Sequence, residues 1–336
     1  MKRTPSGWVV FIFALVLGVL FFVNVSVGSV SIPFTAIIKG LFYHTGIESE
    51  ILWQFRLPKA LTCLLAGGAL ATGGLLMQTL FRNPMAGPDV LGLTSGASLF
   101  VAVLLLASRY SSLLLIQSTW SVAIAASMGG AMVFLVIISI ARYVQDNTAL
   151  LIVGLMISAA TSSFVSVLQF TSQADDLQTF MIWMLGSVGG TNWSELIVLA
   201  SIIGVGLVLS IALIKDLNGI LLGESYALNL GINIKKARVM IVVTTGMMVG
   251  VVTAFCGPIA FVGLAVPHLV RLVIPTADHK TLVPAVMLGG AILLLACDLL
   301  AQLPGSTHVL PLNAITSLIG APIVIWMVIK AKRISV

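Results

Sequence analysis

Four polar side chains recur at helical spacing inside one long apolar stretch, and their chemistry suits the solvation of a hydrophilic solute. They are Ser158, Ser162, Ser166 and Gln169. At 100° per residue they fall within about a quarter of a helix circumference. Polar side chains inside a bilayer need partners or water, so this stripe faces either a neighbouring helix or a wet cavity. If it faces a cavity, the chain moves a hydrophilic solute across a membrane.

The residue types that usually carry catalysis or bind metal are scattered along the chain. The three cysteines and four histidines have neither metal-ligand nor disulfide spacing. The sequence also lacks H-E-x-x-H and the nucleotide-binding pattern G-x-x-x-x-G-K-[ST]. We therefore predict no catalytic residue, no metal site and no cofactor bound by this chain. If ATP drives transport, another polypeptide must bind the ATP and its Mg.

Apolar runs long enough to cross a bilayer recur along the whole chain. The sequence is 59% hydrophobic and 8% charged, with a mean hydropathy of +1.14, whereas soluble domains carry roughly a quarter charged residues. Because a spanning helix needs about 20 apolar residues, we predict an all-α, polytopic membrane protein of ten transmembrane helices. The predicted spans are Val9–Val27, Ala60–Phe81, Val90–Ser108, Ser111–Ala141, Thr148–Thr171, Leu196–Ile214, two spans within Val239–Val270 divided at Gly257-Pro258 because proline interrupts a helix, Thr281–Leu300 and Leu312–Ile329.

The distribution of positive charge predicts the orientation of these spans. Cytoplasmic loops of membrane proteins keep an excess of lysine and arginine. With both termini in the cytoplasm, thirteen of the basic residues fall inside and four fall outside, namely Lys39, Arg56, Lys59 and Arg109. The net charge of +6 is then a topology signal beside anionic lipid, and no basic cluster with aromatic residues indicates nucleic-acid binding.

Two features of the predicted spans concern packing and energy supply. The second span carries Gly67, Gly68, Gly73 and Gly74, which is typical of close helix packing. Asp298 is the only acid inside a predicted span. We expect it to pair with Arg56 or with a backbone group, although a midplane acid could also couple transport to an ion. An ion-coupled secondary carrier is therefore an alternative function.

The longest predicted cytoplasmic loop, residues 215–238, contains a short amphipathic segment. Leu222, Tyr226 and Leu230 have roughly helical spacing, and Gly223 and Gly231 are natural helix stops. We predict a short helix lying across the cytoplasmic face. Such a helix could dock a partner protein.

Five sequence blocks, in order and suitably spaced, resemble the FecCD family of type II ABC importers, the permeases for iron chelates and cobalamin. The segment from Gly223 to Gly231 is similar to the G-E/D-x-x-A-x-x-L-G coupling segment of that family. The other four blocks are Arg56-Leu57-Pro58 before the glycine-rich span, Phe81–Gly92 with Ser95-Gly96-Ala97, Gly257–His268, and Thr316–Pro322.

The resemblance implies one permease domain over residues 1–336, with residues 215–238 as its coupling loop, in a bacterial inner membrane. It implies a homodimer, or a pair with a similar permease, whose pore is lined mainly by the fifth and tenth spans. It further implies two cytoplasmic ATPase subunits and an external substrate-binding protein. The implied substrate is a ferric siderophore, with cobalamin or haem as alternatives. The residues implied to contact the ATPase are Gly223, Glu224, Tyr226, Ala227, Leu230 and Gly231.

The resemblance also implies where the substrate-binding protein docks. In this family acidic residues of that protein meet arginines of the permease, and Arg56 matches one such position, with Lys59 nearby. The chain departs from the family at Gln302, where arginine is frequent, and in lacking a glutamate before Leu310-Pro311. A short outer helix is implied between Asp175 and Trp193.

Overall fold

A computed structural model describes residues 6–28, 40, 46–107, 118–141, 143–144, 147–302 and 309–332. Within these ranges the chain forms helices and turns, with no β-strand. Several residues used to predict the orientation lie outside the described ranges. They are Lys2, Arg3, Lys39, Arg109, Arg142 and Arg333.

Seven of the described helices are long and apolar enough to cross a bilayer, and three shorter apolar helices accompany them. In chain order these ten helices correspond to the ten predicted spans, so the predicted all-α polytopic fold is confirmed. They are α1 (Ser6–Ser26), α4 (Leu57–Phe81), α5 (Leu93–Leu106), α6 (Thr119–Ala141), α7 (Asn147–Thr171), α9 (Trp193–Ala212), α12 (Ile234–Cys256), α13 (Val262–Val273), α14 (His279–Ala301) and α15 (Leu312–Lys332).

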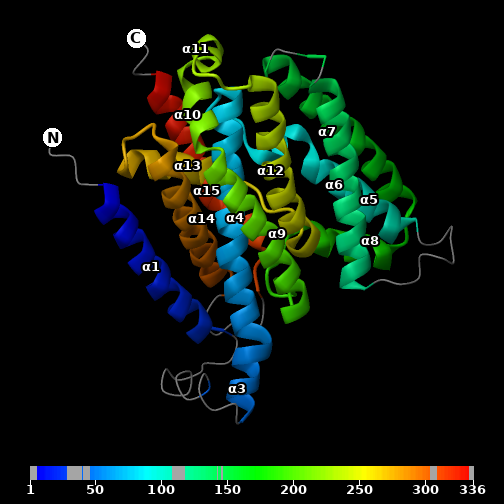
Figure 1. Cartoon of the computed structure of the whole chain (residues 1–336). Coiled ribbons are helices and arrows are strands. Elements are labelled where there is room, and N and C mark those ends of the chain that lie inside the picture. The colour runs from blue at the N-terminus through cyan, green and yellow to red at the C-terminus, as the bar shows by residue number, and fades with distance from the viewer. Residues whose placement is uncertain are drawn as a thin grey trace.

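Helix α4 runs through the middle of the bundle, with α12, α13 and α14 against it (Figure 1). Its glycines allow backbone to touch backbone. A Cβ on Gly67 would lie 2.3 Å from the carbonyl oxygen of Gly290, and one on Gly74 would overlap the carbonyl oxygen of Gly263 at 1.7 Å. The close packing predicted for this span is therefore confirmed.

The break between α12 and α13 falls at the predicted Gly257-Pro258. Gly257 has φ +71°, and a Cβ there would lie 2.4 Å from the carbonyl oxygen of Trp183, so only glycine fits. Helix α13 continues to Val273, beyond the end predicted near Pro267-His268. Pro267 has no N–H to donate to the carbonyl of Gly263 four residues earlier, and that carbonyl lies against Gly74 of α4.

The bundle has two ends, which we name by the short helices found there (Figure 1). The α11 end carries α10 (Ile214–Leu222) and α11 (Glu224–Asn229). The α3 end carries α3 (Ile47–Ile51) and the π-helical turn η1 (Leu52–Arg56), which leads directly into α4. The 3₁₀ turn η2 (Pro88–Leu91) follows α4, and α8 (Ala174–Met184) is the short helix implied after α7.

Candidate functional site: a polar helix face and a coupling surface

The polar stripe lies on α7, one of the least covered of the long helices. In the most apolar 18-residue stretch of α7, only 22% is buried inside the protein. The corresponding value for the segment that contains α4 is 83%. Ser158 and Gln169 are half-buried, whereas Ser162 and Ser166 are exposed. The stripe therefore begins at the edge of the packed face of α7 and turns toward its open side.

Two of the three hydroxyls in this stripe donate to the preceding turn of the same helix. Ser158 donates to the carbonyl of Gly154 at 3.0 Å, and Ser166 donates to that of Ser162 at 3.0 Å. Hydroxyls can bond back to the preceding turn in this way in any helix. Their oxygens keep acceptor capacity on the open side. The hydroxyls of Ser158 and Ser166 therefore do not require the expected partner in a neighbouring helix or water, and the expectation remains for the Ser162 hydroxyl and the Gln169 amide.

The predicted coupling segment folds as α11, with a glycine at each end. Gly223 has φ +125° and separates α11 from α10, and Gly231 has φ +75°. The N–H of Ile232 donates to the carbonyl of Ala227 at 3.0 Å, and that of Gly231 donates to Leu228 at 2.9 Å. These two backbone hydrogen bonds, together with a glycine in the left-handed conformation, form a Schellman motif. It fixes where the coupling helix ends.

Residues 215–238 are not an open loop, because α10, α11 and the first turn of α12 occupy most of the segment. Ala227 is fully buried and faces Gly219 of α10, where a Cβ would lie 3.8 Å from the Ala227 Cβ. The other side chains of α11 are exposed, and among them Glu224 pairs with Arg238 of α12 at 3.5 Å. The exposed apolar side chains of this segment, with that of the preceding Leu222, are Leu222 (64%), Tyr226 (54%), Leu228 (60%) and Leu230 (48%).

Arg82 ties the end of α4 to the coupling segment. Its Nε and Nη2 donate to the carbonyl of Ile220, at 3.1 and 2.7 Å, one turn before Gly223. Arg82 itself adopts the left-handed conformation, with φ +47°, that normally favours glycine. The strain of this backbone is offset by two bonds from a charged donor. The turn after α4 therefore lies against the coupling segment.

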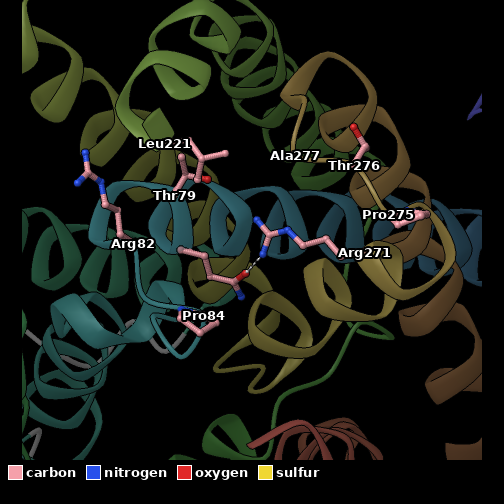
Figure 2. A pocket seen from close by; sticks show the side chains of 9 residues that line it. Thr79, Arg82, Pro84, Leu221, Arg271, Pro275, Thr276 and Ala277 are labelled. Atoms are coloured by element: carbon pink, nitrogen blue, oxygen red, sulfur yellow. Dashed lines mark hydrogen bonds between the residues drawn. The ribbon is translucent and has the colours of Figure 1, made fainter. Parts of the chain in front are cut away.

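A basic pocket of about 400 Å³ opens beside Arg82 at the α11 end (Figure 2). Arg271 of α13 reaches across it and donates to the Gln78 side-chain oxygen at 3.1 Å. The lining residues include two arginines and no acid, so the pocket is positively charged. Neither Arg271 nor Gln78 was among the predicted site residues. The full lining is Gln78, Thr79, Arg82, Pro84, Leu221, Arg271, Pro275, Thr276 and Ala277.

The described histidines of this region take part in structural hydrogen bonds. The His268 Nε2 lies 2.7 Å from the Pro84 carbonyl, and His279 lies between Thr79 and Asn218, at 2.8 and 2.7 Å. Asp278 caps α14, and hydrogen bonds from the Lys280 N–H and the Asn218 amide lower the pKa of its carboxyl. Within the described ranges no cluster of three metal-ligating side chains occurs.

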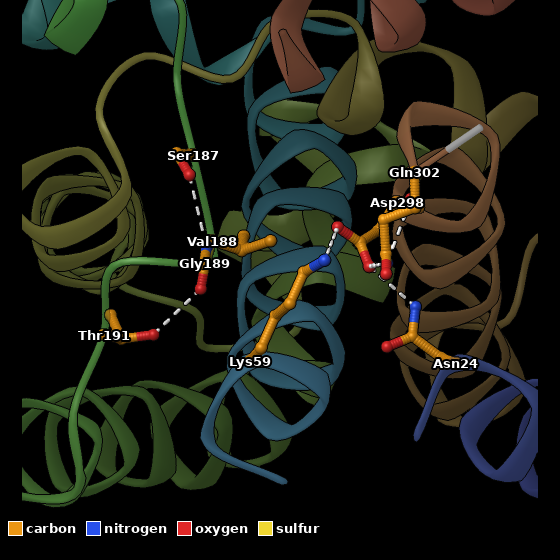
Figure 3. A network of polar contacts seen from close by, with 8 residues as sticks. All are labelled: Asn24, Lys59, Ser187, Val188, Gly189, Thr191, Asp298 and Gln302. Carbon is orange, nitrogen blue, oxygen red and sulfur yellow. Dashed lines mark hydrogen bonds and ion pairs between the residues drawn. The ribbon is translucent and has the colours of Figure 1, made fainter. Parts of the chain in front are cut away.

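At the α3 end, Asp298 of α14 joins α1, α4 and the residue that ends its own helix (Figure 3). The Lys59 ammonium lies 2.9 Å from its Oδ1, and the amides of Asn24 and Gln302 donate to its Oδ2 at 2.8 and 2.6 Å. The side chains of Lys59 and Asp298 are only 18% and 4% exposed. Gln302, which replaces the frequent arginine, is thus a direct partner of the buried acid.

The expected pairing of Asp298 with Arg56 is wrong, because Lys59 takes that place one turn further along the helix. Arg56 instead donates from Nη1 to the carbonyls of Val25 and Ser26 at the end of α1, at 2.9 and 2.7 Å. It is 8% exposed. Docking of a binding protein through Arg56 and Lys59 stays a prediction, and it requires both side chains to leave these contacts.

Comparison with known proteins identifies the family of this chain. The FecCD transport family matches residues 15–330. The chain belongs to the FecCD transport family. The predicted family is therefore confirmed over nearly the whole sequence.

Relatives of this FecCD chain with known names are permeases. The hemin transport system permease protein HmuU of Yersinia pestis is 35% identical over 290 residues, which cover 85% of this chain and 86% of that protein. The vitamin B12 import system permease protein BtuC of Salmonella paratyphi A is 37% identical over 284 residues, 84% of either chain. A solved inward-facing structure of a metal-chelate type ABC transporter matches with a TM-score of 0.85 and 26% identity, covering 96% of this chain and 99% of that one.

This FecCD chain is therefore the permease subunit of a metal-chelate type ABC importer of the bacterial membrane. The prediction that ATPase activity belongs to a separate subunit is confirmed. The family also implies ATPase partners and a substrate-binding protein. The ion-coupled secondary carrier loses its support.

Proposed function

We propose that two copies of this chain, or one copy and a similar permease, enclose a pathway for a ferric siderophore between their α7 faces. The observation that carries this proposal is the exposed hydroxyl stripe of α7. A face that presents Ser162 and Ser166 is a poor lipid contact, because polar groups in a bilayer turn toward protein or water. A second copy placed against α7 would turn this open side into an enclosed, wet path.

The apolar residues around the stripe support the same arrangement. Phe164 and Phe170 on α7 are 65% and 91% exposed, and Leu318 on α15 is 71% exposed. Side chains of this kind can pack against a second copy and seal the path from lipid. Helices α7 and α15 are the fifth and tenth spans, which the family resemblance implies as the main pore lining.

The α11 end is proposed to be cytoplasmic, with both termini on that side. Lysine and arginine are concentrated there, as at Lys215, Lys235 and Lys236, whereas the described basic residues of the α3 end are Arg56 and Lys59. This asymmetry is the one that cytoplasmic loops show. Helix α1 begins nearer the α11 end, since its last turn contacts Asp298 and Arg56 at the opposite end.

The proposed ATPase contact is the exposed side of α11, from Glu224 to Gly231, with the basic pocket beside it. The ATPase subunits bind ATP and Mg, and this chain contributes only the docking surface. Exposed apolar side chains such as Tyr226 and Leu230 are suited to a protein partner. The substrate-binding protein is proposed to meet the α3 end, where Arg56 and Lys59 lie.

A ferric siderophore is proposed as the substrate because the hydroxyl-rich α7 face suits a hydrophilic chelate better than the apolar ring system of haem. Cobalamin is the second candidate, since its polar amide groups suit the same face. Uptake of labelled ferric siderophore, cobalamin and haem by vesicles containing the complete importer distinguishes them. Transport of haem alone would contradict the proposal.

The shared path is tested by cysteine cross-linking. The Ser162→Cys protein in native membranes should form dimers with a short bifunctional thiol reagent. Ser201→Cys is the matched control, because Ser201 is an exposed serine on α9, outside the proposed path. The natural cysteines Cys63, Cys256 and Cys297 are buried, so background reaction should be small. Equal cross-linking at both positions, or at neither, would overturn the arrangement.

A further inference from the structure

A second amphipathic feature lies away from the proposed path, between α6 and α12, with α9 nearby (Figure 1). An apolar groove of about 510 Å³ runs between these helices. On α12 its lining includes Val243, Gly246 and Gly250, and on α6 it includes Phe134 and Met128. These residues follow one face of each helix, so the groove runs along the helix axes.

The groove has an apolar floor that is open at Gly250 and covered at Gly246, where a Cβ would lie 3.0 Å from the ring of Phe134. A Cβ built on Gly250 would meet nothing within 4 Å. At the α3 end the groove finishes at Trp120 and Phe255, whose rings lie 5.6 Å apart, edge to face. From Val243 to Phe255 the floor is about 18 Å long at 1.5 Å per residue. Measured along α12 from Lys235 at the α11 end, the floor begins about 12 Å away at Val243 and passes Gly250 at about 22 Å. An acyl chain that reaches Gly250 therefore extends beyond the middle of a hydrocarbon core about 30 Å thick.

At the α11 end the same two helices border a second cavity, of about 690 Å³. Ile138 of α6 and Val239 of α12 line it, one helical turn beyond Phe134 and Val243 of the groove. Lys235 and Arg238 also line this cavity, and the only acid there is Glu224. Arg238 and Glu224 pair at 3.5 Å, so their charges balance. The Lys235 ammonium therefore gives the cavity a net positive charge.

Asn233 adds a further polar group to the basic cavity. Its side-chain oxygen accepts from the N–H of Lys236 at 3.0 Å, which leaves the amide nitrogen to donate. The cavity thus combines an ammonium, a guanidinium and an amide above an apolar groove. The matching ligand has an anionic head joined to a hydrocarbon chain.

We propose that the cavity at Lys235 and Arg238, with the groove between α6 and α12, binds one anionic phospholipid of the leaflet at the α11 end. Its phosphate lies at Lys235, Arg238 and Asn233, and an acyl chain lies along Val243, Met247 and Gly250, beside the Phe134 ring that covers Gly246. Basic pockets between membrane helices are suited to such head groups. Because Arg238 also holds Glu224 at the start of α11, the bound lipid becomes a neighbour of the coupling helix.

The head-group part is tested with the purified full-length chain in micelles containing equal phosphatidylglycerol and phosphatidylcholine, with bound lipid counted by native mass spectrometry. Phosphatidylglycerol should be retained preferentially. Lys235→Gln should bind it about fivefold more weakly, since one basic residue at the membrane surface contributes about that factor. Lys236→Gln is the matched control, because Lys236 is an exposed neighbour that does not line the cavity.

The acyl-chain part is tested with Gly250→Leu, whose side chain would occupy the groove. It should reduce retention of phosphatidylglycerol severalfold, whereas Gly204→Leu, at an open position on α9, should not. Equal retention by the two lysine variants would overturn the proposal, as would equal binding of both lipids by the unaltered protein. A shift in oligomeric mass in Gly250→Leu with unchanged lipid would show a second copy in the groove, and would also overturn it.

Discussion

Helices α4 and α7 have similar hydropathy but opposite surroundings. The most apolar 18-residue stretches of the two segments have mean hydropathies of 1.7 and 2.1. Of the first stretch 83% is buried, and of the second only 22%. Helix α4 packs glycine against the backbone of α13 and α14, whereas α7 shows hydroxyls on its open side. Hydropathy therefore identifies both as membrane helices, and the small or polar residues within each show which one holds the bundle together.

The largest expected effect comes from adding volume to α4. Gly74→Val should prevent accumulation of folded protein, because any Cβ at this position overlaps the carbonyl oxygen of Gly263. We expect a loss of at least about 3 kcal/mol of stability, the upper range for overpacking. Gly204→Val on α9 is the control, since its Cβ would meet nothing within 4 Å. Thermal unfolding in detergent compares the two, and equal midpoints would refute the backbone contact.

The ion pair that joins α4 to α14 should give the next largest effect. Asp298→Asn leaves the mostly buried Lys59 without its counter-charge, and we expect about 2 kcal/mol of destabilisation, below the full cost of breaking a deeply buried pair. The double variant Lys59→Met, Asp298→Leu should be more stable than the single variant, because no isolated charge remains. Unfolding in denaturant measures the difference, and the opposite order would exclude the pair as the cause.

At the other end of α4, two substitutions of Arg82 should separate its backbone from its side chain. Both Arg82→Ala and Arg82→Gly remove the bonds to the Ile220 carbonyl. Only glycine relieves the left-handed backbone, so the alanine variant should be less stable by about 1 kcal/mol. Chemical unfolding of both variants tests this order. Identical stability would show that the positive φ is not retained without the arginine.

The smallest effect on stability is expected on α7. Ser162→Ala and Ser166→Ala should each change the unfolding free energy by no more than about 0.5 kcal/mol, as is usual for exposed positions. Transport by the complete importer should nevertheless fall, because the path loses polar groups. Parallel uptake and unfolding measurements test this contrast. If these alanine variants lost much stability but transported normally, α7 would be a structural helix like α4, and its proposed part in the transport path would be contradicted.

The sequence was sufficient for the spans because each is an apolar run bounded by charge, proline or glycine, with Asp298 as the one charged residue inside a run. Gly257-Pro258 marked the break between α12 and α13 since a left-handed glycine and a proline interrupt a helix in any context. Gly223 and Gly231 likewise marked both ends of α11. These signals are local, so no knowledge of the neighbouring helices was needed.

Contacts between distant segments could not be predicted in the same way. Arg56 and Lys59 lie one turn apart, and the sequence alone could not decide which of them meets Asp298. That choice depends on where α1 ends, since its last carbonyls accept from Arg56. The left-handed backbone of Arg82 was not predicted, because a left-handed residue at a helix end is usually glycine or asparagine. The outward direction of the α7 stripe likewise depends on which other helices fill the bundle.

The continuity of α3, η1 and α4 has a mechanical consequence. Together they form one run of 35 residues, Ile47–Phe81, about 50 Å long at helical rise and well beyond a hydrocarbon core of about 30 Å. The exposed Glu48 therefore stands at the tip of a lever whose far end is Arg82. A tilt of about 10° in this lever would displace the tip by about 9 Å, so a spin label at Glu48 would magnify small rotations of the central helix into measurable distances.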